Sequence, residues 1–416
     1  MLIGKTALSL REGKRMRTSV FFFVIYLIEF VLLVLPAGAQ VTHGQKPQLP
    51  QPFQTKSAGN GPSGVKPAEG FLPTVPAGFR VNVFAKDFKV PRFLMVAPNG
   101  DLFVADTGAG QVIVLRDPQN TGGAQQREVF ASNLNRPFGI AFREEYVYVG
   151  NTNAVMRFKY DPKTSKRTGE AEKILDVPGG GGHFTRTIAF SKDGSKLYVS
   201  VGSSGNIDIE KDQRRAAVQV CDPDGNNARL FATGLRNAVG LGIEPSTGAV
   251  WVTVNERDEL GDNLPPDYFT SIQDGGFYGW PYSYIGGNVD PRVKPQKPEL
   301  VEKAIIPDVL LGPHVAPLQF AFYTGSQFPE SYRGGAFVAE HGSWNRAARN
   351  GYQVAFVGFK DGKAAEDPAP FLTGLVPDPK GKNVNGRPVG VAVAQDGSLL
   401  VSDDGAGVIY RVSYGK

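Results

Sequence analysis

The chain has 416 residues, with 45 Lys and Arg against 40 Asp and Glu, and is rich in glycine (51 residues). Residues 1–39 hold five of the basic residues and two of the acidic ones, so the remainder is nearly balanced. It therefore lacks the basic excess typical of nucleic-acid-binding proteins, and we expect no nucleic-acid partner. Cys221 is the single cysteine, which excludes an internal disulfide and a CxxCH haem site.

Residues 1–39 have the pattern of an export signal. Basic residues precede an apolar run over 20–35, and the small residues of 37–39 follow it. The apolar run is short for a membrane span and contains Glu29. We predict a signal peptide cleaved after Ala39 and an exported protein, periplasmic or secreted. Membrane anchoring is expected only if this segment is retained.

Residues 40–70 are rich in Gln, Pro, Gly, Ser and Lys, a composition that predicts a flexible linker. The predicted catalytic domain is 71–416. In this region an apolar strand, a turn rich in Asp, Gly or Pro, and a second strand recur six times. Two examples are FLMVAPNGDLFVAD (93–106) and VGVAVAQDGSLLVSD (389–403).

Repeats of this kind predict an all-β, six-bladed β-propeller. The segment 79–88 resembles the strand that precedes other repeats, whereas the last repeat ends one strand short. We therefore expect the N-terminal strand to complete the last blade and close the ring. A parallel α/β fold is excluded because no long stretch has a 3.6-residue apolar period.

Basic residues stand just before the predicted innermost strand of every repeat: Arg92, Arg136, Arg186, Arg236, His314 and Arg387. Guanidinium groups that converge on one channel mouth would create a strong positive potential. Such a site suits a small polyanion with several carboxylates, which arginine binds in a bidentate manner. The alternative is that each arginine pairs with an acid of a neighbouring blade.

The sequence NERDELGDN (255–263) contains more acids than a turn requires. Because hard cations bind carboxylates together with backbone carbonyls, this segment is a candidate calcium loop. The acids Asp106, Asp403 and Asp404 are interpreted as turn residues.

His183 follows four glycines in GGGGHFTRTIAF (179–190). It lies three residues before Arg186 and should reach the same channel mouth, where a neutral imidazole could accept a proton. The glycines would keep the approach to it open. A structural loop histidine is the alternative interpretation.

These motifs resemble the soluble pyrroloquinoline quinone (PQQ)-dependent sugar dehydrogenases, the glucose/sorbosone or aldose sugar dehydrogenase family. The resemblance is strongest to the sorbosone-dehydrogenase-like branch. Besides the His183 region, the matching motifs are GLRNAVGLGIEPSTGAVW (234–251), the acidic loop before GGFYGWPY (275–282), HGSWNR (341–346) and GRPVGVAVAQDG (386–397).

The resemblance implies a quinone and Ca²⁺ at the channel mouth, a sugar or sugar aldehyde as substrate, and an external electron acceptor such as a quinone pool, a cytochrome or a dye. His183 would be the general base while hydride passes to the quinone, and calcium would act as Lewis acid. The implied cofactor-binding residues are Arg236, Asn237, Arg387, Arg186 and Arg346. The implied calcium ligands are the backbone carbonyls of Arg257 and Asp258.

Two departures from the family pattern stand out. Where glucose dehydrogenases have an aspartate that orients the histidine, Ser203 follows Gly202, so either Ser203 or Asp208 would take that role. The Gly-Pro pair that supplies calcium-binding carbonyls is replaced near Arg257-Asp258. The alternative functions are a calcium-dependent lactonase or esterase propeller and a non-catalytic exported binding propeller.

Overall fold

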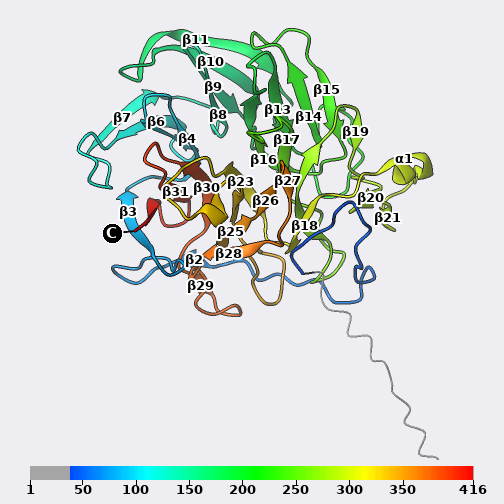
Figure 1. Cartoon of the computed structure of the whole chain (residues 1–416). Coiled ribbons are helices and arrows are strands. Elements are labelled where there is room, and N and C mark those ends of the chain that lie inside the picture. Colours follow the sequence, from blue (N-terminus) through cyan, green and yellow to red (C-terminus); the bar gives the residue numbers. More distant parts are fainter. Residues whose placement is uncertain (1–37, 416) are drawn as a thin grey trace, which may run out of the picture. The chain divides into compact units, whose positions relative to one another are not determined.

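A computed structural model describes residues 38–415, which fold into a series of blades, each built from four antiparallel strands (Figure 1). Blades 1, 2 and 3 are formed in chain order by β4 (Pro91–Val96), β5 (Leu102–Asp106), β6 (Gln111–Arg116) and β7 (Gln126–Ala131); β8 (Ile140–Arg143), β9 (Tyr146–Asn151), β10 (Ala154–Asp161) and β11 (Lys166–Asp176); and β12 (Ile188–Phe190), β13 (Leu197–Val201), β14 (Ala217–Cys221) and β15 (Arg229–Thr233).

Blades 4, 5 and 6 follow the same plan, but the outermost strand of blade 6 comes from the beginning of the domain. Their strands are β16 (Ala238–Ile243), β17 (Val250–Val254), β18 (Pro266–Ile272) and β22 (Val309–Pro313); β23 (Pro317–Phe322), β24 (Ala336–Glu340), β25 (Gln353–Val357) and β28 (Ala369–Leu372); and β30 (Pro388–Val393), β31 (Leu399–Asp403), β32 (Val408–Tyr414) and β3 (Phe79–Ala85).

The innermost strands form a closed ring. In the order β4, β8, β12, β16, β23 and β30, each contacts the next, and β30 contacts β4. Strand β3 pairs antiparallel with β32 from Phe79 opposite Tyr414 to Ala85 opposite Ile409. Both the six-bladed all-β architecture and its closure by the N-terminal strand are thus confirmed.

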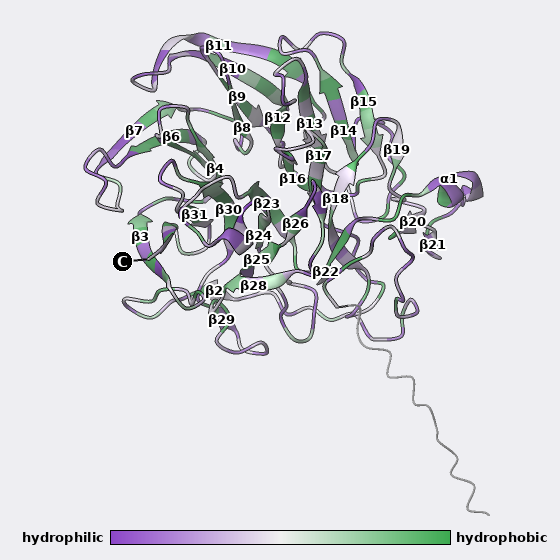
Figure 2. Cartoon of the chain, in the orientation of Figure 1, coloured by the Kyte–Doolittle hydropathy of each residue, from purple (hydrophilic) through white to green (hydrophobic). Residues whose placement is uncertain are grey.

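The hydrophobic core lies between neighbouring blades. Phe103 of β5 packs edge-to-face against Phe142 of β8, with ring centroids 4.9 Å apart, and Phe269 of β18 packs on Phe320 of β23 at 4.7 Å. Figure 2 shows hydrophobic residues along the strands, whereas the outer strand β11 is largely hydrophilic. Because each sheet must bury both faces, blades are stable only when packed side by side.

Short elements extend two of the six blade sheets or lie outside them. Strands β19 (Gly276–Phe277) and β1 (Gln40–Val41) extend blades 3 and 4, and the other pairs are β2 (Gly64–Val65) with β29 (Asn383–Val384), β20 (Ser283–Tyr284) with β21 (Asn288–Val289), and β26 (Phe359–Lys360) with β27 (Lys363–Ala364). The helical elements are α1 (Pro298–Lys303) and the 3₁₀ turn η1 (Glu330–Tyr332).

The segment 40–70, expected to be a flexible linker, lies along the propeller. Strand β1 pairs with β22, and β2 pairs in parallel with β29. The division of the chain at residue 70 stays a prediction that limited proteolysis can test. The predicted signal peptide falls outside the described residues apart from its last two. Between 38 and 415, no helix is long and apolar enough to cross a membrane.

Candidate active site

A cavity of about 290 Å³, here called the mouth cavity, opens where the innermost strands begin. Its wall combines the residues that precede these strands with the loops that follow the second strands of the blades. The lining residues include the polar side chains of Arg92, His183, Arg236, Asn237, His341 and Arg387. The structure therefore brings together four of the residues predicted from the sequence to act on the cofactor or substrate, His183, Arg236, Asn237 and Arg387.

His183 is oriented by Ser203. Its Nδ1 lies 2.9 Å from the Ser203 carbonyl oxygen and 3.0 Å from Ser203 Oγ. A carbonyl only accepts, so Nδ1 carries the hydrogen and Nε2 is left as the acceptor. Ser203 is fully buried, whereas Asp208 is exposed and makes no hydrogen bond to the imidazole. Of the two candidates for orienting His183, the geometry favours Ser203.

The environment of His183 keeps the imidazole neutral. Burial, followed by the charge of Arg236, lowers the pKa of His183 to about 4. Gly202 allows the close approach of His183 and Asn237, because a Cβ at this glycine would lie 2.7 Å from His183 Cβ and 2.4 Å from Asn237 Oδ1. A buried, neutral imidazole with one free nitrogen is suited to accept a proton.

The glycines before His183 have a backbone role. Gly180 and Gly181 adopt φ values of 73° and 76°, which L-residues with a side chain rarely do. Their loop wraps around Arg215, whose NH2 group donates to the carbonyls of Gly179 and Gly180. Only Gly182 of the four lines the mouth cavity. The run of glycines is thus explained mainly by this turn rather than by open space for a ligand.

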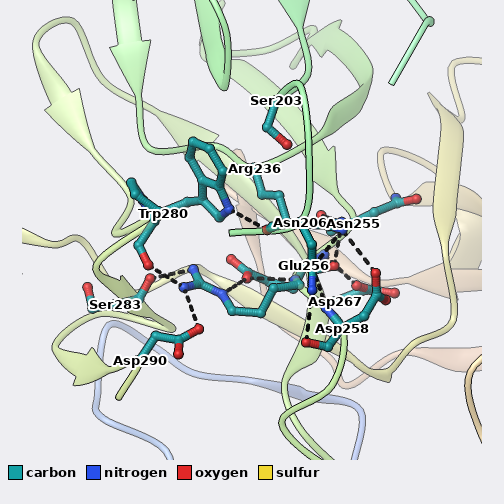
Figure 3. A network of polar contacts seen from close by, with 12 residues as sticks. Ser203, Asn206, Arg236, Asn255, Glu256, Asp258, Asp267, Trp280, Ser283 and Asp290 are labelled. Carbon is teal, nitrogen blue, oxygen red and sulfur yellow. Dashed lines mark hydrogen bonds and ion pairs between the residues drawn. The ribbon is translucent and has the colours of Figure 1, made fainter. Parts of the chain in front are cut away.

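Arg236 lies on the cavity wall, but its hydrogen-bonding capacity is used within the protein. Its Nε donates to the Asn206 carbonyl, NH1 to the carbonyls of Asn255 and Glu256, and NH2 to the side chains of Asn206 and Asp258. Figure 3 shows this guanidinium surrounded by its acceptors. An arginine has five N–H donors, so Arg236 offers the cavity its charge rather than a free donor.

Three further residues of the cavity wall, Arg387, His341 and Arg92, belong to one chain of hydrogen bonds. Arg387 NH2 lies 3.0 Å from His341 Nδ1, and His341 Nε2 lies 2.9 Å from Asp404 Oδ1. The other Asp404 oxygen accepts from Arg92 NH1 at 2.6 Å. Because an arginine only donates, His341 is neutral with its hydrogen on Nε2, and burial lowers its pKa to about 4. Asp404, interpreted from the sequence as a turn residue, joins two arginines of the ring.

Arg186 and Arg346, predicted to bind the cofactor, do not line the mouth cavity. Arg186 is fully buried, and its guanidinium donates to the carbonyls of His183, Thr185 and Pro178. Arg346 donates to the Asp262 carbonyl at 2.9 Å and to Asn263 Oδ1 at 2.6 Å. Both arginines brace loops that border the cavity. Arg136, a further member of the predicted ring, stacks on the Phe184 ring.

The predicted calcium ligands, the carbonyls of Arg257 and Asp258, lie in a loop that is hydrogen-bonded to the protein itself. Arg257 is fully buried and does not line the cavity. The Asp258 carbonyl already accepts from Arg292 NH1 at 2.8 Å and from Asn206 Nδ2 at 3.3 Å. Among residues 38–415, no group of three or more His, Cys, Asp or Glu is arranged to hold a metal ion.

An N-terminal strap, residues 53–61, borders the cavity and was missed by the sequence reasoning. The Asn60 N–H donates to the Trp344 carbonyl at 2.7 Å, and Thr55 Oγ1 accepts from the Asp262 N–H at 2.9 Å. Trp344 lines the cavity and is 54% exposed. Only a composition typical of linkers marks this strap in the sequence.

Two known proteins of similar sequence illustrate what this chain resembles. The chain is 28% identical to an uncharacterised protein of Borreliella burgdorferi, over 82% of this chain and 91% of that protein. It is 25% identical to the pyrroloquinoline quinone-dependent pyranose dehydrogenase of Coprinopsis cinerea, over 83% of this chain but only 55% of that protein. The chain thus spans about half of the Coprinopsis enzyme.

Solved structures share the fold. The holo form of the Coprinopsis cinerea pyranose dehydrogenase PQQ domain aligns with a TM-score of 0.71 at 23% identity, covering 85% of this chain and 100% of that domain. The calcium structure of the Trichoderma reesei family AA12 enzyme aligns with a TM-score of 0.72 at 21% identity, covering 82% and 97%. The model of the TrAA12-like family matches residues 73–267 and 295–415. The chain therefore belongs to the TrAA12-like family.

Proposed function

We propose that this protein is a pyrroloquinoline quinone-dependent sugar dehydrogenase in which His183 is the general base. One observation carries the assignment of the base. Of the three histidines that line the mouth cavity, His341 and His314 each have both ring nitrogens hydrogen-bonded to the protein. His183 alone among them keeps a ring nitrogen, Nε2, without a hydrogen-bond partner among residues 38–415.

The cavity residues fit a flat cofactor with several carboxylates. Asn237 Oδ1 and Arg92 Nε are buried without a partner, and Arg387 NH1 makes no hydrogen bond within the described residues. Together with Arg236, these side chains place three guanidinium groups around the mouth cavity, a suitable environment for carboxylates. Arg92, Asn237 and Arg387 would contact the quinone, and Arg236 would contribute its charge.

When bound, the quinone would supply the two-electron acceptor for hydride from the sugar carbon. His183 Nε2 would take the hydroxyl proton, so that the C–H and O–H bonds are replaced by a carbonyl bond. The Ser203 carbonyl holds the opposite edge of the ring and keeps Nε2 directed at the cavity. Trp344, half exposed at the rim, offers an aromatic face to the apolar side of a sugar ring.

The substrate and the electron acceptor belong to the same proposal. The sequence resemblance favours a sugar aldehyde of the sorbosone type, whereas the Coprinopsis relative is named for pyranoses. The reduced cofactor would pass its electrons to a quinone pool, a cytochrome or a dye. The pattern in residues 1–39 supports export to the periplasm or the medium.

The test is reconstitution of purified protein with the quinone, followed by dye reduction with aldopyranoses and with 2-keto aldehydes. Dye reduction that requires the quinone supports the dehydrogenase, and the faster substrate class identifies the donor. Absence of dye reduction with every sugar, together with tight quinone binding, would favour a binding scaffold. Ester hydrolysis with calcium alone would favour the lactonase.

A further inference from the structure

We propose that the guanidinium of Arg292 occupies the cation position that the family resemblance assigns to calcium, so that the loop over 256–258 is held without a metal ion. Only the chain's own charges and acceptors are involved in this arrangement. It can therefore be tested in the quinone-free protein, and its failure would leave the proposed dehydrogenase activity untouched.

Every acceptor of Asp258 is already paired. Its carbonyl accepts from Arg292 NH1 at 2.8 Å and from Asn206 Nδ2 at 3.3 Å. Its carboxylate accepts from Arg236 NH2 at 3.0 Å and from Asn345 Nδ2 at 2.5 Å. A carbonyl oxygen has two lone pairs, so a metal ion could bind this oxygen only by displacing one of its two donors.

Arg292 also neutralises a buried acid beneath the loop. Its Nε and NH2 donate to the two oxygens of Asp290 at 2.9 and 2.7 Å. The fully buried Arg257 donates to Glu256 Oε2 at 2.9 Å and to the carbonyls of Pro281 and Ser283. These bonds give the loop the cross-links that a calcium ion would otherwise provide.

The cluster is balanced in charge without a metal ion. The guanidinium groups of Arg236, Arg257 and Arg292 form ion pairs with the carboxyl groups of Glu256, Asp258 and Asp290. Asp267 accepts from the Glu256 N–H, and the exposed Glu259 lies 4.0 Å from Arg292 NH1. Burial raises the pKa of Asp267 to about 8, which leaves three anions and three cations among the less exposed groups at neutral pH, whereas the Glu259 carboxylate is 76% exposed to solvent. A divalent ion would add uncompensated charge to a buried site, which is unfavourable.

Few oxygens remain for a metal ion. Glu256 Oε1 is the carboxylate oxygen of this cluster that has no partner, whereas calcium takes six to eight oxygen ligands. The family model leaves residues 268–294 unmatched, and both Asp290 and Arg292 lie in that stretch. Arg292, the proposed substitute for calcium, thus lies in a part of the chain that the family model does not match.

The experiment compares the melting temperature of the full, quinone-free protein in chelator and in millimolar calcium chloride, with the metal content measured by elemental analysis. For the wild type we expect a difference below about 1 °C, because a ligand that does not bind the native state cannot stabilise it. One calcium per chain, or a rise of several degrees, would overturn the proposal.

Arg292→Gln supplies the complementary test. It removes the guanidinium donors from the Asp258 carbonyl and from both Asp290 oxygens, so calcium should raise the melting temperature of this variant but not that of the wild type. Arg116→Gln is the matched control, since Arg116 is 17% exposed against 18% for Arg292 and also binds carboxylates and a carbonyl. It should lose stability without a response to calcium. Equal responses of wild type and Arg292→Gln would refute the assignment. If Arg292→Gln does not fold, the wild-type metal content decides.

Discussion

Replacement of His183 by alanine should slow sugar oxidation by about 10²–10⁴-fold, equivalent to about 3–5 kcal/mol of transition-state stabilisation. The structure offers no replacement base among the cavity histidines, because both nitrogens of His314 and of His341 are hydrogen-bonded. Quinone affinity should stay within about twofold of wild type, since the predicted contacts to its carboxylates come from arginines and Asn237 rather than from His183.

The pH profile provides a second readout of the same base. Burial and the charge of Arg236 lower the pKa of His183 to about 4, so the base is available at neutral pH and lost only in acid. Carboxylates of a bound quinone would offset the Arg236 charge and move this pKa upward. We therefore expect the acid limb of kcat/KM to have a midpoint between about 4 and 6.5.

The assay is dye reduction at saturating quinone, with quinone binding followed separately by fluorescence titration. His43→Ala is the control, because His43 is exposed and absent from the cavity wall. Turnover of His183→Ala within about threefold of wild type would refute the assignment, since general-base assistance is worth far more. An acid limb above the ordinary histidine pKa would contradict the buried environment on which the argument depends.

The remaining predictions concern the cofactor, the rim and the core. Arg387→Ala should weaken quinone binding about ten- to a hundredfold in a fluorescence titration, through loss of a charge-assisted hydrogen bond; unchanged affinity would exclude this contact. Asn60→Ala should raise the KM for sugar with quinone affinity unchanged, because it removes the bond from Asn60 Nδ2 to the Ala347 carbonyl and so loosens the loop that carries Trp344; Asn82→Ala, which removes the bond from Asn82 Nδ2 to the Gly122 carbonyl, should leave KM unaltered. Burial raises the pKa of Glu340 to about 8, so the folded protein holds a proton that the unfolded chain releases, and stability falls as pH rises from about 4.5 to 8. Glu340→Gln should therefore be more stable than wild type by about 2–3 kcal/mol at pH 7 and by less at pH 5 in urea titrations; a pH-independent difference would contradict this.

The architecture could be predicted from the sequence because it depends on residue patterns that are local in the chain. Alternation of apolar and polar residues, with a glycine or aspartate turn in each repeat, specifies a strand pair without reference to distant residues. The strand at 79–88 has no repeat before it, and the last repeat lacks one strand. The two were therefore expected to pair and to close the propeller ring. The position of His183 just before an innermost strand also placed it correctly on the cavity wall, because the propeller repeats that geometry in each blade.

Tertiary structure decided which arginines of the ring face the cavity. Arg186 and Arg387 occupy equivalent repeat positions, yet Arg186 is buried against carbonyls that include Pro178, whereas Arg387 lines the cavity beside His341. A guanidinium turns towards whichever acceptors surround it, and these come from loops whose paths no local pattern specifies. The same holds for Arg292, whose acceptor on Asp258 is 34 residues away. The sequence by itself determined the propeller and the place of His183 in it. Only the folded chain determined which arginines face the cavity with a free donor and which are fully hydrogen-bonded to the protein's own oxygens.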